Sequence, residues 1–390
     1  MQRDILIIGG GPSGLSTALH LIRRAPELGP RLLILEKARY PRPKLCGGAL
    51  LPDAEIILQR LGLDLTELPH VDARLAHLGF AGQGLAVSLP GGHTLRLVRR
   101  DEFDAWLAGK VRAAGIAIQE GVTVRNVLPR PDRVGVETDA GPFEAVVVVG
   151  ADGSTGVTRR CVLPDSPVQT ARLLEVIAPP RAGSTSKAGA SQVQSHADDV
   201  AYFDFRPVPQ GIAGYTWDFP TQVKGRPMRC WGVYDTNLLA DGPRPPLRDP
   251  LADEMLRCGY DLSDCEIQGH PIRWFNPSTG FSVPRVLLVG DAAGVDGIFG
   301  EGISFALGYG QVAADAICAA FASNDFSFLD YRRRVLGSPL GRALRTRTRI
   351  TRLLYRLRWA WFQKFFWRIL KPVVLLVSLR VVLNWARRMA

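Results

Sequence analysis

The stretch Ile7-Ile8-Gly9-Gly10-Gly11-Pro12-Ser13-Gly14 decides how the chain begins to fold. The apolar run at residues 4–8 is typical of a buried parallel strand, and residues 13–25 have the spacing of a helix with one apolar face. Between them, Gly9, Gly11 and Gly14 match the pattern G-x-G-x-x-G. In such a unit the glycines let the backbone approach a pyrophosphate, which the helix N-terminus stabilises. The stretch therefore predicts a dinucleotide site.

An acidic residue follows at the distance that this interpretation requires. A second apolar run, residues 31–35, ends at Glu36, about 22 residues beyond Gly14. A carboxylate there is expected to bind an adenosine ribose, and it disfavours a 2′-phosphate, so NADP is not expected in this slot. The predicted cofactor-binding residues of this first segment are Gly9, Gly11, Pro12, Ser13, Gly14, Glu36 and Lys37.

A second glycine loop repeats the pattern about 280 residues later. The stretch Leu288-Val289-Gly290-Asp291-Ala292-Ala293-Gly294 follows a predicted strand, and Gly300-Glu301-Gly302-Ile303 opens a predicted helix. A third strand ends at Gly150-Ala151-Asp152-Gly153. Because strand ends that converge on one crevice bind dinucleotides, the three junctions together predict FAD. We expect Asp152, Gly153, Gly290, Asp291, Gly300, Gly302 and Ile303 to bind it, with Asp291 at a ribityl hydroxyl.

These junctions predict an α/β fold whose first domain the chain leaves and re-enters. We expect antiparallel strands at 201–205, 214–219 and 230–234, an exposed polar loop at 179–196 and a proline-rich connection at 241–250. The predicted organisation is a discontinuous Rossmann-type FAD-binding domain (1–165 and 276–335), an inserted α+β substrate domain built on an antiparallel sheet (166–275), and a basic amphipathic helical tail (336–390).

The net charge of +11 is concentrated in the tail. Thirteen of the 48 Lys and Arg residues follow residue 341, where there is no Asp or Glu, so the remaining 35 face 37 acidic residues. The body is therefore not a basic nucleic-acid-binding surface. The six cysteines form no C-x-x-C pair, and the spacing of His and Cys predicts no metal site and free thiols in a reducing compartment.

The tail combines a cationic stripe with a cluster of Trp and Phe between residues 359 and 367. Its uncharged run at 372–379 is too short to span a bilayer, for which roughly 20 residues are needed. Such a helix suits the membrane interface, and the alternative is a helical cap packed on the body. Since a strand begins at residue 4, no cleavable signal peptide is expected. We therefore predict a cytoplasmic protein peripherally associated with the inner face of the membrane.

The motifs together resemble those of the flavoprotein hydroxylase superfamily, over about residues 1–335. Three pieces resemble geranylgeranyl reductases more specifically: Pro43-Lys44-Leu45-Cys46-Gly47-Gly48, Gly214-Tyr215-Thr216-Trp217-Asp218-Phe219-Pro220 and Gly300-Glu301-Gly302-Ile303. The resemblance implies that Cys46, Gly47 and Arg100 lie at the flavin. The sequence departs from the family pattern at Gly297, where proline is usual, and at Gly156, where serine is common.

The same resemblance implies a catalytic role for Trp217, Tyr215 and Phe219 as the lining of a substrate cavity, with Cys46 as a further candidate. Alternation along the strand places Asp218 on the opposite face. Two reactions remain open: reduction of C=C bonds in a lipophilic isoprenoid, or NAD(P)H- and O2-dependent oxygenation of a lipophilic, possibly prenylated aromatic compound. A third is electron transfer without a small-molecule product. NADH or NADPH is expected to visit transiently, or a protein partner to donate electrons.

Overall fold

The computed structural model describes residues 2–180, 196–238, 244–377 and 383–389. Its first sheet has the strand order β17-β18-β11-β1-β2-β8, and β10 joins β9 to β11. The pairs from β18 to β8 are parallel, and their central strands are buried apolar runs. The strands are β1 (Gln2–Ile8), β2 (Leu32–Glu36), β8 (Ala117–Glu120), β9 (Val124–Pro129), β10 (Val134–Thr138), β11 (Gly141–Gly150), β17 (Ser282–Val283) and β18 (Val286–Leu288).

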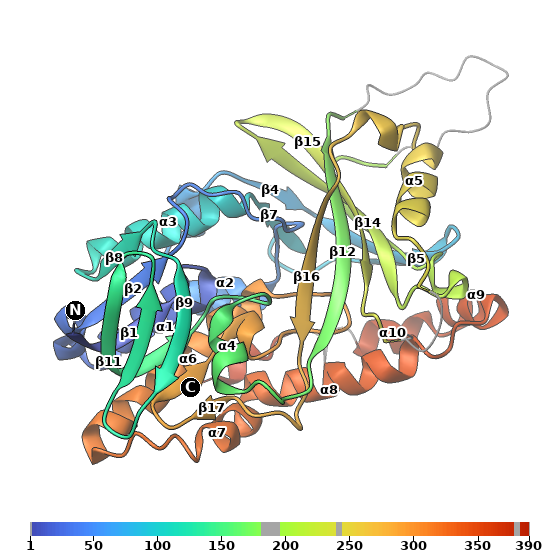
Figure 1. The fold of residues 1–390 in the computed structure, drawn as a ribbon. Helices are drawn as coiled ribbons and strands as arrows, with labels where there is room; N and C mark the ends of the chain where they lie inside the picture. The colour runs from blue at the N-terminus through green and yellow to red at the C-terminus, as the bar shows by residue number, and fades with distance from the viewer. Residues whose placement is uncertain (1, 181–195, 239–243, 378–382, 390) are drawn as a thin grey trace, which may run out of the picture.

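Helices α1 (Pro12–Arg24) and α6 (Ile303–Ser323) pack closely against each other beside this sheet (Figure 1). The Ser16 hydroxyl donates a hydrogen bond of 2.7 Å to the Leu307 carbonyl. Among the described residues, α6 is the one helix long and apolar enough to cross a membrane, but 72% of its apolar window is buried inside the protein. α6 is therefore a core helix. The predicted discontinuous α/β arrangement is confirmed, because β18 and α6 return to the sheet that β1 begins.

A second sheet of seven strands has the order β16-β12-β15-β14-β13-β5-β6. All its pairs are antiparallel except β13 with β5. Its strands are β5 (Leu75–Phe80), β6 (Gln83–Val87), β12 (Gln169–Ala178), β13 (Val200–Asp204), β14 (Gly214–Val223), β15 (Arg226–Asp235) and β16 (Gln268–Trp274).

The second sheet differs from the predicted division of the chain at one point. The prediction assigns residues 75–87 to the first part of the FAD-binding domain (1–165). In the structure, β5 and β6 in this range extend the seven-stranded sheet. The reason is burial: Ala76, Leu85 and Val87 join the same core cluster as the aromatic side chains of β14. The predicted loop at 179–196 falls largely on residues outside the described ranges. Of the predicted connection at 241–250, residues 244–247 are described and form no helix or strand, and α5 begins at Arg248.

The remaining body elements connect the two sheets. A small sheet has the strand order β3-β7-β4, and α3 begins directly after β7. These elements are α2 (Pro52–Arg60), α3 (Arg100–Ala113), α4 (Val157–Val162), α5 (Arg248–Arg257), β3 (Ala49–Leu50), β4 (His70–Ala73) and β7 (Leu95–Val98).

The C-terminal region forms α7 (Tyr331–Gly337), α8 (Pro339–Leu354), α9 (Ala360–Ile369) and α10 (Lys371–Val377). The first sheet with its helices and the second sheet form two lobes, and α8 runs along both of them (Figure 1). α9 and α10 lie below the second sheet. On α8, Arg347 is fully buried and forms ion pairs with Asp296 at 3.1 Å and with Glu301 at 3.0 Å. Its guanidinium also lies 4.7 Å from the ring centre of Phe305.

The last described segment, 383–389, also packs on the body. Trp385 stacks on Phe305 with ring centres 4.9 Å apart, and Asp53 accepts hydrogen bonds from the amides of Asn384 and Ala386. The tail is thus in large part the helical cap that the sequence left as an alternative. Only α9, α10 and their surroundings retain the exposed amphipathic character predicted for the whole segment.

We predict that Arg347→Met strongly destabilises the protein. The substitution keeps the side-chain volume but leaves two buried carboxylates without their counter-charge, a change that costs roughly 3–5 kcal/mol. Chemical denaturation followed by tryptophan fluorescence measures the loss. Arg349→Met on the exposed face of the same helix is the matched control and should stay close to the wild type. Equal stability of the two variants would contradict the role given to Arg347.

Candidate active site

A cavity of about 680 Å³ lies between the two sheets, a size typical of ligand pockets. The structure brings together almost all the residues predicted from the sequence. Those that line the cavity are Gly9, Gly11, Pro12, Ser13, Glu36, Lys37, Cys46, Gly47, Arg100, Asp152, Gly153, Tyr215, Trp217, Phe219, Asp291, Gly300, Gly302 and Ile303. The exceptions are Gly14 and Gly290, which lie just behind the lining.

The N-terminus of α1 opens onto this cavity without a side-chain cap. Its first N–H groups are therefore available to an anion. The space beside Gly11 is open, since a Cβ there would meet only Arg42 Nη2 at 3.8 Å. Gly14 serves the packing instead, because a Cβ on it would lie 2.1 Å from the Gly9 carbonyl oxygen. This is the cradle that a pyrophosphate requires.

Glu36 lies at the end of β2, beside this cradle, and is 4% exposed. Its carboxylate accepts hydrogen bonds from the amides of Gly10 at 2.8 Å and Ala38 at 2.9 Å. Tyr40 donates a hydrogen bond to the Gly10 carbonyl. These bonds fix the carboxylate at the cavity wall, where the sequence predicts a ribose contact.

Asp152 holds the third strand end in place. It accepts hydrogen bonds from the amide and hydroxyl of Thr158, while its Oδ1 atom is buried without a partner. Burial raises the pKa of this carboxyl, and the Thr158 bonds oppose the rise. A Cβ on Gly156 would lie 2.1 Å from Asp152 Cγ, which explains why no serine occupies that position.

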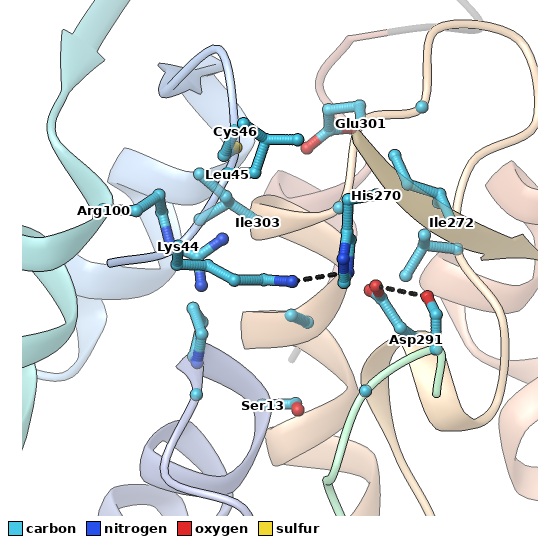
Figure 2. A pocket seen from close by; sticks show the side chains of 18 of the residues that line it. Ser13, Lys44, Leu45, Cys46, Arg100, His270, Ile272, Asp291, Glu301 and Ile303 are labelled. Atoms are coloured by element: carbon cyan, nitrogen blue, oxygen red, sulfur yellow. Dashed lines mark hydrogen bonds between the residues drawn. The ribbon is translucent and has the colours of Figure 1, made fainter. Parts of the chain in front are cut away.

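The N-terminus of α6 forms the opposite end of the site. Its N-cap residue Gly302 provides no side-chain cap, and Asp291 nearby accepts a 2.9 Å hydrogen bond from Ser154 (Figure 2). Gly290 has a φ of +57° and lies against Ser13, which explains its place behind the lining. The glycine at 297 has a local cause too, because a Cβ there would lie 2.8 Å from the Trp274 ring.

Arg100 lines the cavity but is engaged by its own helix. Two hydrogen bonds of 2.9 Å join its guanidinium to Asp104, and Arg42 reaches the same carboxylate at 3.1 Å. Cys46 lies nearby in the loop before β3, and its sulfur accepts a hydrogen bond from the Gly48 amide at 3.4 Å. Both residues are at the cavity wall, as the resemblance implied, and their roles toward a cofactor stay predictions.

Sequence reasoning missed a pair of polar side chains at the centre of the site. Lys44 Nζ lies 2.6 Å from His270 Nε2, close to Asp291 (Figure 2). Burial, followed by the charge of Lys44, lowers the pKa of His270 to about 4, and burial also lowers the pKa of Lys44. His270 is therefore neutral near pH 7. Lys44 lies in a quoted motif, but no sequence signal pointed to its partner on β16.

The second sheet contributes an aromatic wall. Tyr215, Trp217 and Phe219 line the cavity from β14, joined by Phe203 and Tyr234. Asp218 faces the other way, as predicted, and is held there by Arg229 and His196. A wall of this composition offers a ligand mainly apolar contacts and few hydrogen bonds.

Comparison with known proteins agrees with this geometry. A family model described as an FAD-binding domain matches residues 2–228. The chain belongs to this FAD-binding domain family. Sequence relatives of the family member include a menaquinone reductase of Mycolicibacterium smegmatis, 26% identical over 80% of this chain and 76% of the relative, and Protein FixC of Escherichia coli, 26% identical over 86% and 82%.

Solved structures share the whole architecture. A geranylgeranyl bacteriochlorophyll reductase-like protein from Thermoplasma acidophilum has a TM-score of 0.70 at 20% identity, covering 97% of this chain and 92% of the other. The flavin-dependent brominase Bmp2 also has a TM-score of 0.70, at 19% identity, covering 100% and 95%. At these identities the likeness shows the fold.

This member of the FAD-binding domain family is an FAD-dependent oxidoreductase. Its own residues fit FAD: an uncapped helix N-terminus and a glycine cradle lie at one end, and the N-terminus of α6 with Asp291 lies at the other. In the first turn of α6, the Ser304 amide donates to Glu301. The predictions of FAD and of a flavoprotein family are confirmed.

We predict that Gly14→Ala lowers the affinity for FAD at least tenfold, which corresponds to about 1.4 kcal/mol. The added methyl group cannot share space with the Gly9 carbonyl, so α1 must move away from the cradle. Fluorescence titration of the apoprotein with FAD measures the change. Gly109→Ala on α3 is the control, because a Cβ there meets nothing within 4 Å and the affinity should be retained. Wild-type affinity in Gly14→Ala would contradict the cradle.

Proposed function

We propose that this oxidoreductase reduces C=C bonds of a lipophilic isoprenoid chain at a membrane surface. The observation that carries the proposal is the aromatic wall of Tyr215, Trp217 and Phe219, which continues the flavin-site cavity into an apolar compartment. An isoprenoid chain is long and apolar, and burying it there contributes roughly 25 cal/mol for each Å² removed from water. The sequence relation to a menaquinone reductase agrees with a substrate of this class.

When bound, FAD supplies hydride chemistry once it has been reduced. The protein holds the dinucleotide and excludes water. The N–H groups at the start of α6 stabilise negative charge that develops on a bound group beside Gly302 and Ile303. Lys44 and His270 provide a second polar contact, and Trp217 and Tyr215 align the substrate chain. Electrons come from NADH or NADPH visiting transiently, or from a carrier protein.

The membrane contact is assigned to α9 and α10. The large apolar side chains exposed there, between 38% and 67%, are Trp359, Trp361, Phe365, Ile369, Val373, Leu375 and Leu376. Exposed cationic side chains accompany them at Arg356, Arg358, Lys364 and Arg368, with no acidic residue in the segment. A helix with this composition binds at the lipid interface, and each cation contributes on the order of 1 kcal/mol near anionic lipid.

The inner face of α9 packs against the apolar part of the cavity. Trp367 stacks on Phe205 with ring centres 4.8 Å apart and belongs to the core cluster that contains Trp217. α9 also packs on β5 and β6, which contribute Ala76, Leu78 and Val87 to the cavity lining. A lipid chain at the bilayer surface is therefore one helix away from the cavity. The protein is proposed to act peripherally, on the cytoplasmic face.

We predict that the FAD-loaded protein saturates geranylgeraniol or geranylgeranyl diphosphate when it is reduced by dithionite without air. Mass spectrometry should show a gain of two hydrogen atoms for each bond reduced. In Trp217→Ala, turnover should fall about tenfold or more while bound FAD is retained, because the wall loses its largest aromatic side chain. A gain of one oxygen atom, found only in air and with NAD(P)H, would show a monooxygenase instead.

We predict that Trp361→Ser, Phe365→Ser and Ile369→Ser, combined, weaken binding to vesicles by roughly 100-fold, because three apolar side chains no longer enter the interface. Co-sedimentation with vesicles of phosphatidylcholine and 30% phosphatidylglycerol measures the partition coefficient. Since all three side chains are exposed, Tm should stay near the wild-type value. Deleting 342–390 is unsuitable, because it also removes Arg347. Unchanged sedimentation of the triple variant would overturn the membrane contact.

A further inference from the structure

Glu175 is a buried carboxyl group to which the proposed flavin site gives no task. It lies on β12, is 3% exposed and lines the cavity. Its Oε2 atom is buried without a hydrogen-bond partner. Buried polar atoms in native proteins nearly always have a partner, so an unpartnered oxygen on a ligand cavity indicates a group that acts on the ligand.

Strand register places Glu175 beside the aromatic wall. Glu175 on β12 and Trp217 on β14 both pair with Gly232 on the strand between them. A Cβ on Gly232 would lie 2.1 Å from the Trp217 ring, so the indole covers this glycine. The carboxyl and the indole are thus neighbours in one cross-strand row that faces the cavity.

The loop before β3, which contains Cys46, approaches Glu175 from the side of the first sheet. Cys46 and Cys230 on β15 lie beside the carboxyl group. Glu175 therefore lies where the Cys46 loop approaches the substrate sheet. Among the described residues of that sheet, it is the one acidic side chain in the cavity lining.

Its protonation state suits proton donation. Burial raises the pKa of Glu175 to about 7, and the charge of Arg99, followed by the polar groups of Cys46 and Cys230, opposes that rise. General acids work best when their pKa is near the working pH. Other candidates are poorer: the hydroxyls of Tyr215 and Tyr234 donate to the carbonyls of Phe299 and Gly297, and neutral His270 has no proton to spare beside Lys44.

We propose that Glu175 is the proton donor for saturation of the substrate C=C bond, an assignment that rests on the proposed reductase function. The π bond opens, one carbon forms a C–H bond with a hydride, which reduced flavin supplies, and the other carbon forms a C–H bond with the Glu175 proton. The O–H bond of Glu175 breaks, and solvent returns its proton. The flavin is oxidised by two electrons, and NAD(P)H or a carrier protein restores them.

Anaerobic single turnover of dithionite-reduced, FAD-loaded enzyme with geranylgeraniol or geranylgeranyl diphosphate tests this proposal between pH 5.5 and 8.5. The wild-type rate should fall as pH rises through about 7, because the carboxyl loses its proton. In Glu175→Gln the rate should be at least about 100-fold lower and independent of pH over this range. Glu175→Asp should recover part of the rate. Glu254→Gln removes a buried carboxyl on α5, outside the cavity, and should keep the wild-type rate.

A second readout does not depend on turnover. Because the folded-state pKa of Glu175 is raised above its unfolded value, ionisation costs stability as pH rises from about 4.5 to about 7. Glu175→Gln lacks this cost, so its Tm should rise relative to the wild type across that interval. The difference should level off at about pH 7, where the rate profile has its midpoint.

The outcomes separate the two proposals. If the wild type saturates neither compound, the reductase function fails and the assignment of Glu175 fails with it. If the wild type saturates one of them and Glu175→Gln matches its rate and pH profile, only the assignment is overturned, even when the Tm difference is present. A lost rate with retained FAD, partial rescue by Glu175→Asp and a Tm difference that levels off at the midpoint of the rate profile would support it.

Discussion

The close packing of α1 on α6 is the constraint on which the site depends. Ser16 bonds to the Leu307 carbonyl, and Gly310 leaves no room for a side chain, since a Cβ there would lie 2.5 Å from Ser16 Oγ. This contact joins two helices separated by about 280 residues. It brings both of their N-termini to one cavity, so that two positive dipole ends face the space for one dinucleotide.

The second lobe adds an apolar environment to the polar one that the two helix N-termini create. Its cavity face is aromatic and aliphatic, and the carboxyl of Glu175 is the acidic exception. The low polarity that favours an apolar substrate is also what raises the pKa of this carboxyl. The proposed substrate binding and the proposed proton supply thus share one physical origin. The buried cluster of Arg347, Asp296 and Glu301 fixes the loop that joins the two environments.

Much of the site could be predicted because its signals are local. Gly14 is required by a contact with the Gly9 carbonyl five residues earlier, and the inward face of Trp217 follows from strand alternation. The rest depends on pairing across long separations. Lys44 meets His270 across 226 residues, and Glu175 becomes significant only when β12 aligns with β15. The role of Arg347 was hidden because a buried arginine and a solvated one look alike in a cationic stripe.

Because β5 and β6 belong to the second sheet, the chain crosses between the two lobes several times. The chain visits that sheet at 75–87, leaves for the first sheet and returns at residue 169, and the C-terminal segment finally reaches back to α2 and α6. Neither lobe is therefore a continuous piece of polypeptide, and several covalent connections bridge the cleft. Free hinge opening between the lobes is restrained, so exchange of bound molecules depends on local movements at the cavity mouth.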